Sequence, residues 1–382
     1  MRPVVFALLL ALPAADPPAP THDGKTLAAW VDQLTDAKPE VRLTAVEEIG
    51  AIGPDAKSAI APLLLVLKRD PADVVRTAAA ESLGKMGPAA ESAARALAAA
   101  LKEDKSELVH GQAVLALGKI GKASTPYLLE MLDDSSPQVR RDAAAALGQV
   151  GPDAKEAVKP LIPLLKDSDE GVRIAAFDAL GKIGPDAADA LPQLSVFLRD
   201  PQYRNEAAAA MVGLGKVSVP TFIAGVGDMD VALRRLSAFA LGRIGPDAKA
   251  GVPALIEAMK DMDIALRRTA SESLGKIGSN AAAAADVLLD ALKKDEDPVV
   301  RTNAAMDLGL LGLAAGKIVG PLTDAMADKD SEVRRRAAEG LGGVGPAAKS
   351  ALPALKDALT DKDPIVRDAV RDALKKIEPP KP

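Results

Sequence analysis

The sequence predicts an all-α fold, a solenoid in which about eleven helix pairs stack into a right-handed superhelix. Two observations lead to this fold class. A motif of the form V-R-x-x-A-x-x-x-L-G-x-I-G-P recurs every 30 to 34 residues, and such a period indicates stacked helical units rather than one globular core. Alanine, the best helix former, is abundant throughout, whereas aromatic residues make up only 2% of the chain.

An arginine marks the repeat most clearly. It holds the same place in ten copies, and His110 takes this place in one further copy. Counting from that place, alanine lies three residues on in nine of the eleven copies. Glycine lies eight residues on in nine copies and eleven residues on in ten. The arginines are Arg42, Arg76, Arg140, Arg173, Arg204, Arg234, Arg267, Arg301, Arg334 and Arg367.

The two ends of the chain differ from the repeats. Arg2 precedes an apolar run, 4–12, that is followed by small residues, and this pattern is typical of a secretory signal peptide over residues 1–15. Residues 16–24 are rich in proline and are expected to be a linker. The repeat solenoid is then expected over 25–378, with a short tail at 379–382. A signal peptide predicts an exported protein, periplasmic or extracellular; without one the protein is expected in the cytoplasm.

One copy, from Gly151 to Gly184, shows the predicted unit in detail. Gly151 and Pro152 suit the end of one helix and the first turn of the next, and apolar residues at helical spacing predict a first helix over 153–166. After a turn, Asp169 is expected to cap a second helix, because its carboxylate can accept backbone N–H bonds. The apolar face of that helix carries Val172, Ala176, Leu180 and Ile183.

This unit resembles HEAT repeats, in particular the HEAT-like class also found in phycobilisome lyases. The resemblance covers about Lys25 to Ile377, which gives eleven helix pairs. It implies that the recurrent arginine and an aspartate six residues before it bond within and between repeats, so these residues are structural rather than catalytic. We assign this structural ladder to Asp167, Arg173, Asp261, Arg267, Asp328 and Arg334, among others.

The sequence offers no catalytic constellation, metal site or cofactor site. The chain has no cysteine and two histidines, so metal-ligand pairs are absent from it. Gly340, Gly342 and Gly345 spell G-x-G-x-x-G, but they close a helix of the repeat instead of following a strand. A net charge of −5 argues against nucleic-acid binding. No internal segment is expected to span a membrane.

The variable surface of the second helices is the remaining candidate site. In a solenoid of this kind these helices line the concave face, which commonly binds an extended or helical partner. Arginine beside exposed aromatic residues or methionine is the composition of an interface centre; the alternative is a solvated face with Phe239 tucked between helices. The candidate partner-binding residues are Arg235, Phe239, Arg268, Met306 and Arg335.

The expected function is a non-enzymatic scaffold that binds an unknown protein or peptide on its concave face. An accessory to a lyase-type enzyme, cradling a substrate, is one alternative, and a pure structural spacer is another. The sixth repeat departs most from the pattern. Leu198 replaces the ladder aspartate, which is expected to leave Arg204 without that partner, and Val212 replaces a recurrent glycine. A bend or hinge is therefore expected between Pro201 and Asp228; the alternative is a small irregularity that local packing absorbs.

Overall fold

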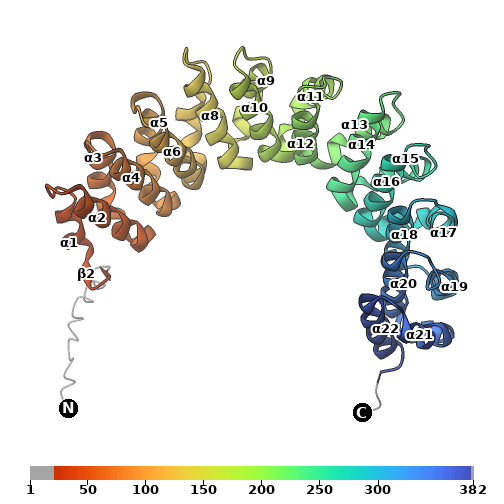
Figure 1. The fold of residues 1–382 in the computed structure, drawn as a ribbon. Coiled ribbons are helices and arrows are strands. Elements are labelled where there is room, and N and C mark those ends of the chain that lie inside the picture. Colours follow the sequence, from red (N-terminus) through yellow and green to blue (C-terminus); the bar gives the residue numbers. More distant parts are fainter. Residues whose placement is uncertain (1–20, 380–382) are drawn as a thin grey trace, which may run out of the picture. The chain divides into compact units, whose positions relative to one another are not determined.

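The computed structural model describes residues 21–379, in which the chain forms eleven helix pairs (Figure 1). This arrangement confirms the predicted all-α solenoid class. The first helices of the pairs are α1 (Leu27–Gln33), α3 (Ile60–Arg69), α5 (Ala94–Glu103), α7 (Thr125–Leu129), α9 (Val158–Leu164), α11 (Leu191–Phe197), α13 (Val219–Val226), α15 (Val252–Ala258), α17 (Ala285–Lys294), α19 (Ala315–Ala325) and α21 (Leu352–Asp357). The second helices are α2 (Pro39–Ile52), α4 (Asp73–Lys85), α6 (Glu107–Ile120), α8 (Pro137–Val150), α10 (Glu170–Ile183), α12 (Arg204–Leu214), α14 (Val231–Ile244), α16 (Ile264–Ile277), α18 (Pro298–Leu310), α20 (Ser331–Val344) and α22 (Pro364–Ile377).

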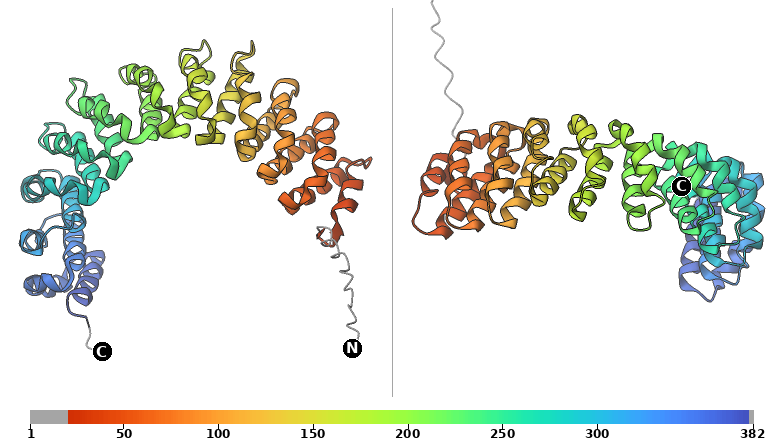
Figure 2. Two further views of the ribbon diagram at one scale, coloured as in Figure 1. Left: turned by 180° about the vertical axis from the view of Figure 1, so that it is seen from behind. Right: turned by 90° about the horizontal axis from the view of Figure 1, so that it is seen from above.

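The chain divides into two compact units, one ending at Met131 and the other beginning at Leu132. Unit 1 contains α1 to α7 and unit 2 contains α8 to α22. Within each unit, successive second helices pack against one another, and a first helix packs on the second helix of its own pair where both lie in that unit. In two opposite views, the first helices of unit 2 form its outer layer and the second helices form its inner layer (Figures 1 and 2). The window expected to bend, 201–228, lies inside unit 2, and no boundary between units falls there.

Most pairs are joined to the next by a short 3-10 segment, which the sequence did not predict. The first helix expected over 153–166 is instead a 3-10 segment, η4 (Gly151–Ala157), followed by the shorter α9. Ala154 interrupts the helical geometry with φ −97° and ψ 24°. The other 3-10 segments are η1 (Gly53–Ala59), η2 (Gly87–Ala93), η3 (Gly121–Ser124), η5 (Gly184–Ala190), η6 (Gly215–Ser218), η7 (Gly245–Gly251), η8 (Gly278–Ala284), η9 (Gly345–Ala351) and η10 (Ala358–Thr360).

The glycine eleven residues after the arginine ends the second helix. At Gly245, for example, φ is 72° and ψ is −138°, a backbone conformation that side chains with a Cβ rarely adopt. All ten glycines of this column have positive φ. The helix beginnings follow the expected chemistry as well: the Asp169 carboxylate accepts a hydrogen bond from the Val172 N–H at 3.0 Å, which confirms the predicted cap.

The glycine eight residues after the arginine allows second helices to touch backbone to backbone. A Cβ on Gly84 would lie 2.9 Å from the Ala116 Cα, and one on Gly181 would lie 2.9 Å from the Ala210 Cα. These distances are shorter than packing between a Cβ and a neighbouring backbone allows. Close stacking of second helices therefore requires glycine on one helix and a small residue on the next.

A β-hairpin lies at the start of the described chain. β1 (Thr21–His22) pairs antiparallel with β2 (Lys25–Thr26), so the described part of the expected linker is ordered as a strand and turn. The Trp30 indole N–H donates to the His22 carbonyl at 3.1 Å, and the Lys25 ammonium lies 4.0 Å from the ring centroid. Trp30 is buried. The hairpin and Trp30 together cover the open end of the helical core. The predicted signal peptide, 1–15, lies outside the described residues.

Two stretches, Pro39–Arg69 and Arg204–Val226, are long and apolar enough to cross a membrane by length and composition, so the expectation that no internal segment meets this test was wrong. Each stretch is a second helix followed by the next first helix. The chain is broken between the two helices at Gly53 or Gly215, where φ is positive. Their apolar residues pack into the core between the layers, which accounts for the composition.

Two adjacent glycines of α20 test the stacking rule. A Cβ on Gly342 would lie 3.0 Å from the Ala373 Cα of α22, whereas a Cβ on Gly343 meets nothing within 4 Å. We expect Gly342→Leu to destabilise the C-terminal repeats by about 1–3 kcal/mol through overpacking. Gly343→Leu, the matched control, should stabilise α20 by up to about 1 kcal/mol, because leucine is the better helix former. Thermal unfolding of both variants measures this, and equal shifts in one direction would contradict the rule.

Candidate functional site

The recurrent arginine joins the two helices of its own repeat. In repeat nine, Nη1 of Arg301 donates to the Asp295 carbonyl at 2.9 Å and to the Glu296 carbonyl at 3.1 Å. These carbonyls lie in the turn between α17 and α18, where no helical partner reaches them. The guanidinium therefore fixes the turn by satisfying backbone groups that the turn itself leaves unpaired.

The same guanidinium also joins neighbouring repeats. Nε and Nη2 of Arg301 donate to the Asp328 carboxylate of the next repeat at 2.8 and 2.9 Å, in the bidentate geometry that arginine favours. The Asp328 carboxylate accepts a further bond from the Asp330 N–H at 2.8 Å. Equivalent pairs within the units are Arg42–Asp70, Arg76–Asp104, Arg140–Asp167, Arg234–Asp261, Arg267–Asp295 and Arg334–Asp361.

The pairing runs from each arginine to the aspartate of the following repeat, which changes the partners expected for Arg173. The Asp167 carboxylate is bound by Arg140, and Arg173 reaches only the Asp167 carbonyl, at 2.6 Å. Arg204, expected to lack a partner, is paired with Asp230 at 2.8 Å. The substitution at Leu198 instead removes the acceptor of Arg173.

A tyrosine replaces the missing carboxylate. The Tyr203 hydroxyl accepts hydrogen bonds from Nε and Nη2 of Arg173 at 2.9 and 2.5 Å. The Tyr203 ring packs against Phe177 and Phe197, with centroids 6.0 and 6.1 Å away. The sixth repeat thus exchanges an ion pair for a small aromatic cluster, which holds the same junction by hydrogen bonding and apolar burial.

Ladder arginines lower the pKa of several of the carboxylates that they bind. Hydrogen bonds from Arg140 lower the pKa of Asp167, and those from Arg334 lower the pKa of Asp361, because both favour the charged form. Arg235 likewise lowers the pKa of Asp263 to about 2. A carboxylate whose pKa is lowered in the folded protein adds stability at pH values above its unfolded pKa, which is near 4. This stability is lost as the pH falls through the pKa of the folded state. The ladder therefore stabilises the protein at neutral pH and weakens only in strong acid.

The candidate partner-binding arginines belong to further ion pairs. Arg235 bonds Asp263 and Arg268 bonds Asp297, and each of these aspartates caps the next second helix. Arg335 bonds Glu332 and Glu339 on its own helix, and Met306 is half-buried. Of the five candidates, Phe239 alone lines a cleft on the second helices, with 42% of its surface exposed.

The cleft beside Phe239 arises where the glycine that lets two second helices touch is replaced. Val212 stands in the glycine position of α12, facing α14, and its branched side chain keeps the two helices from the close contact made elsewhere. A cleft of about 210 Å³ lies between them, lined by Val212, Phe239, Ala240 and Arg243, among others. A second cleft of about 450 Å³, between α10 and α12, shares Val212 and Arg243 with the first. We call the two together the α10–α14 groove.

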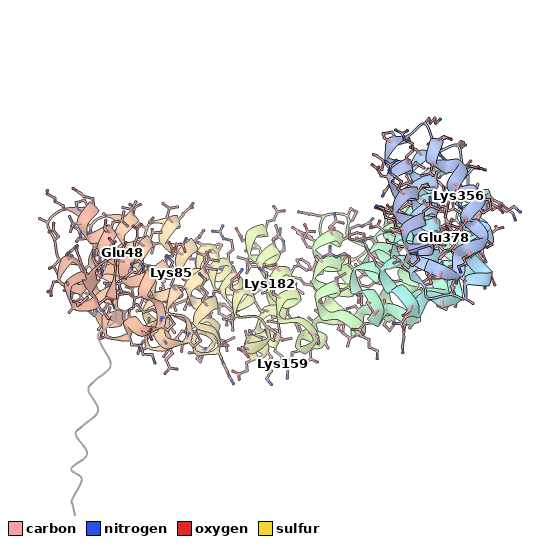
Figure 3. All side chains as sticks on the ribbon, turned by 90° about the horizontal axis from the view of Figure 1, so that it is seen from below. Glu48, Lys85, Lys159, Lys182, Lys356 and Glu378 are labelled. Carbon is pink, nitrogen blue, oxygen red and sulfur yellow. The ribbon has the colours of Figure 1, made fainter. Side chains whose placement is uncertain are left out.

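One cation of this groove lacks a carboxylate partner. On α4, α10 and α16 the basic residue nine positions after the arginine is paired with an acidic residue one turn earlier, as in Lys182–Asp178 at 2.8 Å. On α14 the earlier residue is Phe239, so Arg243 lies over that ring, 5.8 Å from its centroid. No carboxylate within residues 21–379 lies within 4.0 Å of the Arg243 guanidinium. Figure 3 shows Lys182 on the second-helix side of unit 2, and Lys159 of α9 at its edge.

Sequence reasoning selected Phe239 as a candidate but not Arg243, Lys182 or Ile174, three further exposed residues that line the groove. The arginine could have been found by comparing each basic residue with the residue four positions earlier. The departure at Val212 was noticed, but its consequence, a gap between two helices, needs the packing geometry.

A buried acid lies outside the groove, between α16 and α18. Asp307 occupies a column that holds only alanine, serine or glycine in the other repeats from the second onward. It is fully buried, and neither carboxylate oxygen has a hydrogen-bond partner among the described residues. Burial, with a smaller contribution from the charge of Glu272, raises the pKa of Asp307 well above its ordinary value. The side chain is therefore a source of local instability.

A family model described as HEAT repeats matches residues 27–118, 60–148, 125–214, 219–309 and 319–381. No curated protein matches the sequence. Among solved structures, yeast importin-beta (Kap95p) aligns with 92% of this chain and 54% of its own, at 13% identity and a TM-score of 0.56. The karyopherin Kap121p bound to Pho4p aligns with 92% of this chain and 45% of its own, at 14% identity and a TM-score of 0.60. The chain thus spans about half the length of these proteins, and at this identity the likeness shows the fold alone.

Removing one arginine tests the ladder. Arg301→Ala removes the arginine donors of the Asp328 carboxylate and of two turn carbonyls, and we expect a loss of about 1–3 kcal/mol. Because each repeat interacts only with its neighbours, hydrogen exchange should rise mainly in α18 and α20. Arg371→Ala removes an exposed pair with Asp368 and serves as the control, with little change expected. Exchange that rises evenly along the chain would contradict the local role.

Asp307 should make stability depend on pH. The pKa of Asp307 is raised in the folded protein. The stability of the fold is therefore greatest below the unfolded pKa, near 4, and is lost as the pH rises through the pKa of the folded state. We expect Asp307→Ala to melt higher than the wild type, by a margin that grows between pH 5 and pH 8. In Asp307→Asn the side chain stays polar but cannot ionise. The difference in melting temperature between Asp307→Asn and Asp307→Ala should therefore not grow with pH, although the buried amide should keep Asp307→Asn the less stable of the two. Melting temperatures that change in parallel for all three proteins would contradict this assignment.

Proposed function

Since the chain belongs to the HEAT repeat family, we propose that it is a non-enzymatic scaffold that binds a protein or peptide on the second-helix face. The observation that carries the proposal is the α10–α14 groove, where Phe239 and Ile174 are exposed together with an unpaired cation. Exposed aromatic and arginine side chains at a concave place are the composition of protein-binding sites.

The comparisons support a protein partner. The structures similar to this chain include Kap121p bound to Pho4p and Kap95p in complex with RanGDP, both of which hold other proteins.

Within residues 21–379 no group of three or more His, Cys, Asp or Glu side chains could hold a metal ion. The ladder carboxylates are held by arginines, which gives them a structural role rather than a catalytic one.

The location of the scaffold is also proposed. Residues 1–15 have the composition of a signal peptide, and on that ground we propose that the scaffold works after export, in the periplasm or outside the cell. A lyase-type accessory role requires a substrate held on the same face, and a spacer role requires no partner at all. These two alternatives are outcomes of the experiment below.

Photo-crosslinking from defined positions tests the binding face. A benzophenone amino acid is placed at Ile174 or Phe239 on the second helices and, as controls, at Leu65 or Val196, exposed residues of first helices. In extract of the native cells, we expect protein adducts from the second-helix positions only, and excess unlabelled protein should suppress them. Adducts with a small molecule would indicate the substrate-cradling role. Equal labelling from both faces, or none, would overturn the scaffold proposal.

A further inference from the structure

We infer that the α10–α14 groove binds an acidic segment of a protein partner, one that presents an apolar side chain beside a carboxylate. This inference rests on the proposed function and deepens it by naming the chemistry of the partner. It depends on three features of the groove: its shape, its apolar floor and an arginine that no carboxylate of the described residues pairs.

The smaller of the two clefts, between α12 and α14, comes from a single substitution in the repeat. Elsewhere a glycine lets second helices approach until backbone atoms touch, as at Gly148 and Ala179, where a Cβ would lie 3.0 Å from the neighbouring Cα. Val212 prevents this contact between α12 and α14. The opening lies on the second-helix side, between helices whose axes are separated by about 8–10 Å each. An extended segment of about eight residues is long enough to cross all three helices.

The floor of the groove is apolar and partly exposed. Ile174 of α10 is 44% exposed and Phe239 of α14 is 42% exposed. Ala209 and Val212 of α12 lie between them in the shared part of the groove. Burying these side chains under a partner removes apolar surface from water, and the aromatic ring offers a flat contact for an aliphatic or aromatic side chain.

The positive charge of Arg243 favours a partner that carries a carboxylate. Arg243 has no carboxylate within ion-pair distance among the described residues, and the Lys276 ammonium also lies near the Phe239 ring, 5.6 Å from its centroid. Lys276 is already held by Glu272, so Arg243 supplies the free positive charge. A carboxylate beside Phe239 would complete the pairing that Asp178 and Glu272 provide on α10 and α16.

Two acidic residues line the groove, and Asp178 is paired with Lys182. Glu206 of α12 lines the larger cleft, and its buried Oε2 has no hydrogen-bond partner among the described residues. It requires a donor, which a backbone N–H or an amide side chain of the partner can supply. It also repels a second carboxylate, so the acidic group of the segment belongs at Arg243 and the amide donors belong at Glu206.

The direct test measures binding of defined synthetic peptides by fluorescence anisotropy. One probe, about eight residues long, alternates leucine with aspartate and glutamate, and its matched partner carries lysine in place of each acid. The whole chain has a net charge of −5, so non-specific attraction favours the basic peptide. We expect the acidic peptide to bind more tightly in spite of this, and its affinity to fall with added salt.

Variants then locate the binding. Phe239→Ala and Arg243→Glu should each weaken the acidic peptide by about tenfold or more. Val212→Gly should weaken it as well, because α12 and α14 can then approach and narrow the groove while every charged residue is kept. Lys85→Glu on α4 makes the same change in net charge at an exposed site and is the matched control, with no loss expected. Circular dichroism of each variant verifies the fold.

The inference is overturned if the basic peptide binds as well as the acidic one, or if Lys85→Glu weakens binding as much as Arg243→Glu. Unchanged binding in Phe239→Ala and Val212→Gly also overturns it. These failures are distinct from failure of the scaffold itself. Protein crosslinks from the second helices together with no preference for the acidic peptide would leave the scaffold standing and remove only the chemistry assigned to its partner.

Discussion

The bond between one arginine and the aspartate of the following repeat fixes how each helix pair is placed on the next, and the rest of the structure depends on that placement. At Arg301, for example, the guanidinium donates to turn carbonyls of its own repeat through one nitrogen and to the next carboxylate through two others. A lysine could not make both sets of bonds, because its ammonium lacks the planar fork. The position of each helix pair relative to the next is therefore set by a side chain with fixed geometry, and apolar burial between the layers is added to that frame.

The groove lies where this frame is altered at two positions of the sixth repeat. Tyr203 replaces a ladder carboxylate and joins α10 to α12 through its hydroxyl and the Phe177 and Phe197 rings. Val212 then replaces a stacking glycine and separates α12 from α14. A repeat protein can open a site in this way without an insertion, because loss of one close contact is tolerated while the ladder bonds on either side persist.

Asp307 illustrates a different departure from the pattern. Serine at the equivalent position donates to a carbonyl of the preceding second helix, as Ser273 of α16 does to Ala238 of α14 at 2.9 Å. A carboxylate in that place can donate only when protonated, and no acceptor is supplied to it among the described residues. The stack is thus not uniform in stability. The junction of α16 and α18 is weakened by a buried acid, whereas the junction of α18 and α20 has a complete Arg301–Asp328 pair.

The sequence by itself determined the helix pairs, their number, the capping aspartates and the glycines that end each second helix. These features are local, so a column of ten positive-φ glycines or an N-cap such as Asp169 follows from residues close together in the chain. Only the tertiary structure decided which repeat supplies each partner of the ladder, because Arg173 and Asp167 are six residues apart yet their side chains bond to different neighbours. It also decided that Arg235 and Arg268 are committed to ion pairs while Arg243 is not. The reason is physical: a repeated sequence specifies the unit, but distances between side chains of adjacent units are set by how closely their backbones stack.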